Sequence, residues 1–183
     1  MKSFRTHTLF LLFLVALAEL ASLPSARAMQ SREQEAKAAL NSLYETSPAA
    51  KALGARAKGI LVFPEIRKGG FILGGQFGHG VLLKNDKLVA RYDVDGVLFG
   101  LEAGAQTFAY AVFFMTDAAL EEMRAAHGLS IGADPNIVVV DAGNAKELTT
   151  ANASADVYAY VFKQKGLMGG IALQGLKFTE IER

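Results

Sequence analysis

The sequence predicts an α+β fold, in which a β-barrel-like antiparallel core carries about three helices on its surface and has mobile loops. Three observations lead to this prediction. Apolar residues recur at helical spacing in only three segments, whereas most of the remaining chain of 183 residues favours strands. Two glycine-rich runs, residues 68–75 and 165–175, each place a Lys-Gly pair ahead of apolar residues. Repeated glycines inside strands indicate bends or close backbone approach, which curved and closed sheets require.

The first 28 residues have the three parts of a secretory signal peptide. Two basic residues precede an unbroken apolar run, residues 9–18, and Ala26-Arg27-Ala28 supplies a small-x-small cleavage pattern. This apolar run is too short to span a bilayer. We therefore expect an exported protein that is cleaved after Ala28 and resides in the periplasm or cell envelope or is secreted. Residues 29–183 then form one domain.

Charge and cysteine content narrow the classes of function. The whole chain has a net charge of +1, and loss of the leader, with three basic residues and one acidic residue, leaves 16 basic and 17 acidic residues, or −1. A near-neutral domain lacks the broad basic footprint of a nucleic-acid-binding protein, so we expect no nucleic-acid partner. The chain contains no cysteine, which excludes disulfides and thiolate chemistry.

Three segments have the apolar spacing of helices. They are residues 30–45, 49–58 and 118–127. Ser47 can cap the second helix, and Pro48 suits its first turn. Asp117 can cap the third helix, and Gly128 can end it.

The other apolar segments predict strands. They are residues 60–63, 70–84, 88–92, 97–115 (one long bent strand or two shorter ones), 137–140, 157–162, 167–173 and 176–181. In the second of these, bulky residues share one parity and glycines mostly the other. Pro64 is expected to end the first strand, residues 85–87 and 93–96 to form turns, and residues 141–156 to form a long mobile loop. Residues 163–166 are expected to be a hairpin turn.

Three motifs together carry a family resemblance. They are Ala57–Pro64 (AKGILVFP), Gly100–Gln106 (GLEAGAQ) and Lys165–Gly175 (KGLMGGIALQG), in this order. From about the second predicted helix to the C-terminus the chain resembles the SYLF domain, also called the Ysc84 actin-binding domain, a family with exported bacterial members. The resemblance implies a β-barrel core with helices outside it, mobile loops, and binding of phosphoinositides and membranes. Eukaryotic members are also associated with actin. An exported protein of bacterial type is not expected to meet actin, so we expect no actin partner here.

One stretch departs from the family pattern. Where many members carry Ser-Arg-Ser-Lys-Gly, this chain has Phe-Lys-Gln-Lys-Gly at residues 162–166. Lys163 and Lys165 keep the basic character, but the arginine that could hold a phosphate with two parallel hydrogen bonds is absent.

The candidate binding residues are Lys163, Lys165, Arg67 and Lys68. Each pair lies at the start of a glycine-rich run, so the two pairs could form a small phosphate-binding rim with the help of glycine amides. A basic residue near an anionic surface contributes about 1 kcal/mol, so four give weak, salt-sensitive binding. The alternative is that these residues are solubilising charge on exposed turns.

The leading hypothesis is therefore a non-enzymatic exported domain that weakly binds anionic phospholipid or phosphoinositide headgroups at a membrane surface. The alternative is a structural protein of the cell envelope that binds another envelope protein through a sheet edge. We expect no catalytic residues, no cofactor and no metal site, because the three histidines lack the spacing of metal ligands.

Overall fold

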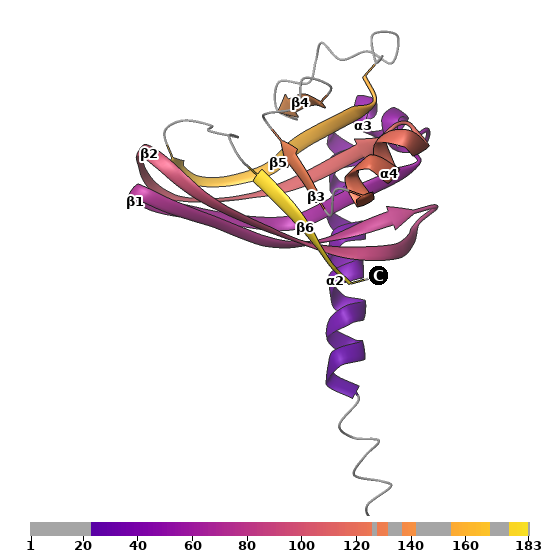
Figure 1. Cartoon of the computed structure of the whole chain (residues 1–183), viewed down its shortest axis with the longest axis horizontal. Coiled ribbons are helices and arrows are strands. Elements are labelled where there is room, and N and C mark those ends of the chain that lie inside the picture. Colours follow the sequence, from indigo (N-terminus) through magenta and orange to yellow (C-terminus); the bar gives the residue numbers. More distant parts are fainter. Residues whose placement is uncertain (1–22, 126–127, 132–136, 142–154, 169–175, 183) are drawn as a thin grey trace, which may run out of the picture. The chain divides into compact units, whose positions relative to one another are not determined.

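The computed structural model describes residues 23–125, 128–131, 137–141, 155–168 and 176–182. The chain divides into two compact units, residues 1–34 and 35–183, and the sheet and its cores belong to the second. The described elements are α2 (Leu23–Thr46), α3 (Pro48–Gly54), β1 (Gly59–Lys84), β2 (Lys87–Phe114), α4 (Asp117–Ala125), β3 (Gly128–Ile131), β4 (Ile137–Asp141), β5 (Val157–Met168) and β6 (Leu176–Glu182) (Figure 1). Among the helices in these ranges, none combines the length and the apolar content that a membrane span requires.

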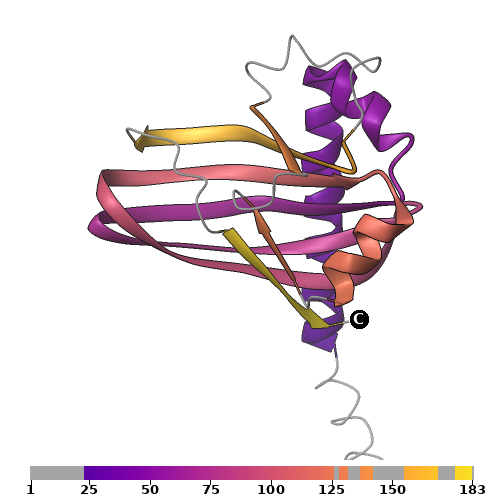
Figure 2. The ribbon, with the colours of Figure 1, turned by 45° about the horizontal axis from the view of Figure 1, so that its top comes forward.

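The six strands form one sheet with the order β3-β6-β2-β5-β4, and β1 also pairs with β2. The α+β prediction is confirmed. β1 and β2 form a long antiparallel ribbon that folds back on itself, so that its two halves face each other (Figures 1 and 2). The sheet is barrel-like but not closed, because β3 and β4, at the two ends of the order, do not pair with each other in the part of the chain described.

One strand pair corrects the expectation of an antiparallel core. β4 runs parallel to β5, from Ile137 opposite Val157 to Asp141 opposite Val161. A parallel pair needs a connection of about a dozen residues or more, and residues 142–156 satisfy this requirement. Of the predicted mobile loop, residues 142–154 lie outside the described ranges, as do residues 169–173 of a predicted strand.

Glycines allow the two halves of β1 to approach each other. A Cβ atom added at Gly74 or Gly78 would lie 2.8 Å from a backbone carbonyl oxygen in the first half of the same strand, that of Gly69 or Glu65. At Gly80 it would lie 2.6 Å from the ring of Phe63. The glycine face predicted for residues 70–84 is therefore the face that turns inward, as close backbone approach requires.

Both long strands continue where the sequence predicts an end or a turn. β1 runs through Pro64, because the register shifts there and leaves the missing proline N–H out of the ladder. β2 likewise runs through residues 93–96 as a strand. The turn predicted at residues 85–87 is confirmed for Asn85 and Asp86, with φ values of 51° and 59°, which suit a two-residue hairpin turn; Lys87 already begins β2.

Two apolar cores hold the sheet. The first lies between the two halves of the folded ribbon; it includes Phe63, Tyr110, Val112, Phe178 and, from α4, Leu120 and Met123. We call the ribbon face that lines this core the inner face. The second core lies between the outer face of the sheet and helices α2 and α3; it includes Leu43, Leu53, Val62, Phe113 and Tyr160.

α2 begins at Leu23, seven residues before the predicted start, whereas α3 and α4 each begin one residue before theirs. The hydroxyl of Ser47 accepts a hydrogen bond from the Ala50 amide at 3.2 Å and caps α3. At α4 the prediction is wrong by one residue, because the Thr116 hydroxyl, not Asp117, accepts the bond from the Ala119 amide at 3.2 Å. α3 ends at Gly54, four residues before the predicted end.

Candidate functional site

The predicted hairpin turn at residues 163–166 is wrong, because β5 continues through it. The residues of β5 and β2 pair on both sides of this segment, and Lys163 and Gln164 together face the single residue Phe108. This arrangement is a β-bulge, in which an extra residue bends the strand and redirects its side chains. Lys163 has a φ of 53°, and Gly166 has a φ of 111°, so the bulge uses backbone conformations that most residues avoid.

β1 carries a second bulge at the same level of the sheet. Pro64 and Glu65 together face Ala109, the neighbour of Phe108 on β2. The extra residue changes which side chains of β1 point inward. Phe63 before the bulge and Ile66 after it both lie in the first core. In a strand without a bulge, residues 63 and 65 would share that face, and residue 66 would point to the other.

Beyond the two bulges, three strands return to register and place a polar row on the outer face. Arg67 of β1 pairs with Thr107 of β2, which pairs with Lys165 of β5. We call these three residues the basic row. Adjacent strands lie about 4.8 Å apart, so the Arg67 and Lys165 backbones are separated by about 10 Å. The structure thus joins residues from both predicted basic pairs, although 98 positions separate them in the chain.

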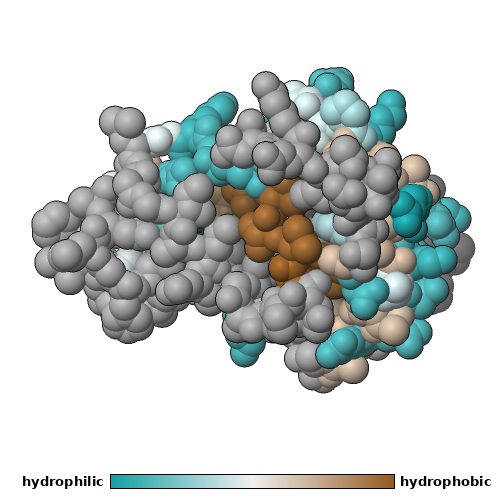
Figure 3. All heavy atoms as spheres, turned by 90° about the horizontal axis from the view of Figure 1, so that it is seen from above, coloured by the Kyte–Doolittle hydropathy of each residue, from teal (hydrophilic) through white to brown (hydrophobic). Residues whose placement is uncertain are grey.

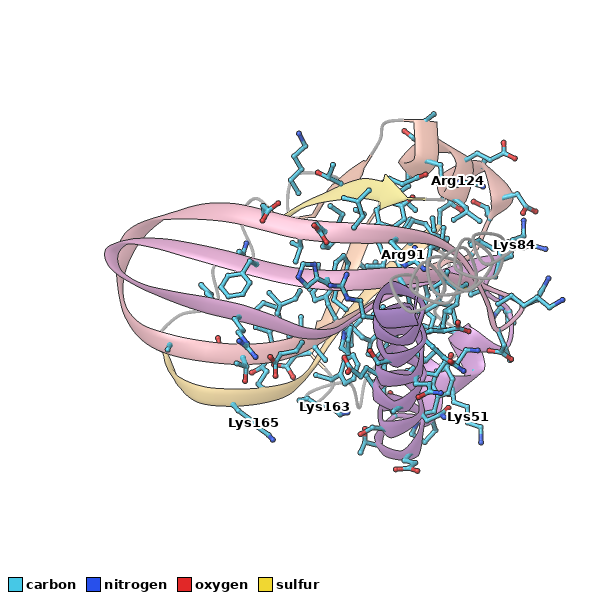
Figure 4. The ribbon with its side chains drawn as sticks, turned by 90° about the horizontal axis from the view of Figure 1, so that it is seen from below. Lys51, Lys84, Arg91, Arg124, Lys163 and Lys165 are labelled. Atoms are coloured by element: carbon cyan, nitrogen blue, oxygen red, sulfur yellow. The ribbon has the colours of Figure 1, made fainter. Side chains whose placement is uncertain are left out.

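The β5 side of this site is open to solvent. Lys163, Gln164 and Lys165 are exposed, and both lysines project from the outside of β5 (Figure 4). Gly166 cannot easily be replaced, because a Cβ atom there would lie against the carbonyl oxygen of Ala105. The glycine that follows the lysines therefore fixes the geometry of the bulge that presents them.

Two carboxylates flank the cations. The Arg67 Nε lies 2.7 Å from Glu65 Oε1 in a pair whose side chains are both more than half exposed. On the other side, Gln164 Nε2 lies 3.5 Å from Asp141 Oδ2 of β4. The three cations Arg67, Lys163 and Lys165 are therefore partly balanced, and the local charge is small and positive. The Glu65–Arg67 pair could have been foreseen, because residues two apart on a strand share a face.

Lys68 does not belong to this exposed site, which corrects the prediction of a four-residue rim. It is only 5% exposed, and it pairs in register with Gln106, on the face opposite to Arg67. Two consecutive strand residues cannot both face the same surface, and the bulge at Pro64 determines which of them faces outward.

The other basic side chains that Figure 4 labels lie in different surroundings. Arg91 is buried, and the Lys84 ammonium lies 3.7 Å from the Asp117 carboxylate near α4. Lys51 is exposed on α3 and provides a comparison site away from β5. Within the described ranges, no group of three His, Cys, Asp or Glu side chains could hold a metal ion.

A comparison with protein-family models finds a match in the C-terminal part of the chain. Residues 95–183, 89 of the 183 residues, match the family model described as Ysc84, Las17-binding protein actin regulator. This part of the chain is therefore similar to that family. The match confirms the predicted resemblance for the motifs at Gly100–Gln106 and Lys165–Gly175, whereas Ala57–Pro64 lies outside the matched range. No curated protein matches the chain.

The matched range divides the candidate site between two parts of the chain. Lys163, Lys165 and Thr107 lie within the Ysc84 match, and Arg67 lies outside it. Sequence reasoning missed Thr107, because an isolated threonine carries no signal until the register with both neighbouring strands is known. It also missed Gln164 and Asp141, whose contact depends on the parallel pairing of β4.

Proposed function

We propose that this chain is a non-enzymatic domain that weakly binds anionic phospholipid headgroups, phosphoinositides among them, at a membrane surface. The observation that carries the proposal is the basic row, in which register pairing brings Arg67 and Lys165 together beside the exposed Lys163. A phosphate placed over Thr107 would meet cations on both sides and a hydroxyl between them.

The local charges set the strength that we expect. Each cation near an anionic surface contributes about 1 kcal/mol, and Glu65 offsets part of the Arg67 contribution. Binding should therefore be weak for a single headgroup, become stronger on a surface with many headgroups, and decrease as salt screens the charges over about 10 Å. Lysines bind phosphate as point charges, so the net charge of the lipid should matter more than the position of its phosphates.

A charge-reversal pair tests the proposal. Lys163→Glu with Lys165→Glu should abolish most co-sedimentation with vesicles that contain phosphatidylserine or a phosphoinositide, and vesicles of phosphatidylcholine alone should bind little of either protein. The matched control is Lys51→Glu with Lys58→Glu, which reverses two exposed lysines away from β5. Equal loss in both double variants would mean that only net charge matters, and unchanged binding of the first would contradict the proposal.

We also propose that the protein is exported and cleaved after Ala28. The leader pattern supports this proposal. In the full chain, α2 begins at Leu23 and therefore continues across the proposed cleavage point. Intact-mass measurement of protein recovered from the cell envelope or medium should give a chain that begins at Met29. A mass that still includes residues 1–28 would contradict this proposal.

A second candidate function is protein binding through the β4 edge. β4 ends the strand order, and its Val138 and Val139 are 36% and 38% exposed. Figure 3 shows apolar atoms at the surface on the side of the molecule where β4 lies. An envelope protein could add a strand there. A photocrosslinker placed at residue 138 should capture one defined envelope protein, and the additional substitution Val139→Lys should abolish this crosslink. That result would favour this candidate. We do not expect actin to be that partner.

A further inference from the structure

The long ribbon has a bent end that lies away from the helices. β1 and β2 both turn back at this end, opposite to α3 and α4 (Figures 1 and 2). The register changes across the bend, from Phe71 opposite Ala103 to Leu73 opposite Phe99. One residue of β1 therefore spans the bend where β2 uses residues 100–102.

We call residues 69–75 and 97–105 the ribbon tip. Of these 16 residues seven are large and apolar, six are glycine, two are alanine, and one, Glu102, is charged. The large apolar residues are Phe71, Ile72, Leu73, Val97, Leu98, Phe99 and Leu101. Next to the tip on β1 lies Phe77, whose side chain is 54% exposed on the outer face. The topology thus gathers apolar sequence at one end of the sheet.

The basic row lies directly behind the tip. Arg67 precedes the tip on β1 by two residues, and Thr107 follows it on β2 by two residues. From Arg67 to Phe71, four residues of strand span about 13 Å. One leaflet of a bilayer has a hydrocarbon layer of about 15 Å. Cations set back by this distance would lie at headgroup level if the residues of the tip entered the hydrocarbon layer.

We propose that the ribbon tip inserts into the outer part of an anionic bilayer while the basic row stays among the headgroups. This inference rests on the proposed function and adds an apolar anchor to it. The occupant is a lipid surface because the charge beside the tip on the β5 side is positive, from Lys163 and Lys165. Asp95, the register partner of Phe77, is exposed on the other half of the ribbon. The β5 side should therefore face the bilayer.

Salt separates the apolar part of binding from the electrostatic part. Salt weakens the attraction of the basic row, but it does not weaken the burial of apolar surface. Binding to anionic vesicles should therefore fall as salt rises and then level off at a residual value. Leu98→Ser with Phe99→Ser should remove this residual binding at high salt. We expect roughly a tenfold or greater loss of affinity, because the burial of two large apolar side chains is lost.

A single fluorescent label gives the decisive test, because the chain contains no cysteine and no tryptophan. Leu98→Cys carries an environment-sensitive dye at the tip, and Glu121→Cys carries it on the exposed face of α4. Vesicles of phosphatidylcholine and phosphatidylserine should shift the tip emission to the blue, and nitroxide-labelled lipid tails should quench it. The α4 label should show neither effect. Circular dichroism and thermal unfolding verify that the labelled proteins and the serine variant are folded.

The outcomes separate the two proposals. Co-sedimentation without a blue shift or quenching at residue 98 overturns insertion and leaves headgroup binding intact. Absence of co-sedimentation with any anionic vesicle overturns both. A blue shift that grows with protein concentration in the absence of vesicles means that a second copy of the chain covers the tip, and this also overturns insertion. If the serine variant does not fold, the labelled protein alone decides.

Discussion

The helix-covered end and the tip of the same ribbon differ in composition and in surroundings. At the helix-covered end every side chain of β2 from Phe108 to Phe114 is buried, because the inner face meets the first core and the outer face meets α2 and α3. Toward the tip the outer face is open, and it carries the basic row and Phe77. An unbroken apolar run on an antiparallel strand thus indicates coverage on both faces at one end. At the other end lie the apolar residues of the tip, which we propose enter a bilayer.

The comparison predicts that stability depends mainly on the helix-covered end. Phe113 is fully buried, and its ring packs against that of Tyr160 with centroids 5.6 Å apart. Phe113→Ala should lower the free energy of unfolding by about 3–5 kcal/mol, because it leaves a cavity under the helices. Chemical denaturation measures this change. A loss below about 1 kcal/mol would mean that the helices contribute little to the core.

The close approach of the two halves of β1 predicts the next largest effect. Gly78→Ala should cost roughly 1–3 kcal/mol, because its Cβ would press on backbone atoms of Glu65 and Ile66. Gly75→Ala on the outer face is the matched control, since the nearest atom would be 3.8 Å away. The control should stay within about 0.5 kcal/mol. Equal denaturation midpoints for the two variants would refute the inward glycine face.

A partly buried tyrosine, Tyr44, and a fully buried one, Tyr110, predict a smaller effect on stability that depends on pH. Burial, with a further contribution from Asp86, raises the pKa of Tyr44 to about 12, and burial also raises the pKa of Tyr110. In the unfolded chain a tyrosine has a pKa of about 10. Above that pH the unfolded state binds fewer protons than the folded state, so stability is complete below about pH 10 and falls as pH rises toward 12.

A phenylalanine variant at residue 44 tests this titration. Tyr44→Phe should make the alkaline decline in the denaturation midpoint shallower, and an unchanged decline would contradict the assignment.

The Tyr110 hydroxyl finds no hydrogen-bond partner among the described residues. Tyr110→Phe should therefore be neutral or stabilise the fold by up to about 1 kcal/mol near pH 7, since it removes an unsatisfied polar group.

Local chemistry made much of the fold predictable from sequence. Ser47 and Pro48 mark the start of α3, Asn85 and Asp86 mark the hairpin, and the glycine parity of residues 70–84 gives the face of close approach. Each of these features depends only on residues near one another in the chain. Together they distinguish the helical segments from the strands, and the α+β class follows from that distinction.

Long-range register explains what sequence reasoning missed. Residues 163–166 suit a turn or a bulge equally well, and only pairing with Phe108 distinguishes the two. The bulge at Pro64 exchanges the faces of β1, so that Arg67 points outward and Lys68 inward. The parallel direction of β4 also depends on tertiary pairing, because no local pattern in a run of valines encodes a strand's direction.

Hydrogen exchange with and without anionic vesicles tests the central claim most directly, because it examines both ends of the ribbon in one experiment. We predict that vesicles of phosphatidylcholine and phosphatidylserine slow exchange in peptides that cover residues 97–108 and 157–168, and leave peptides from α3 and α4 unchanged. Vesicles of phosphatidylcholine alone should change neither set. Slower exchange confined to α3 and α4, or equal slowing at both ends, would contradict the assignment of the basic row and the ribbon tip as the membrane-binding surface.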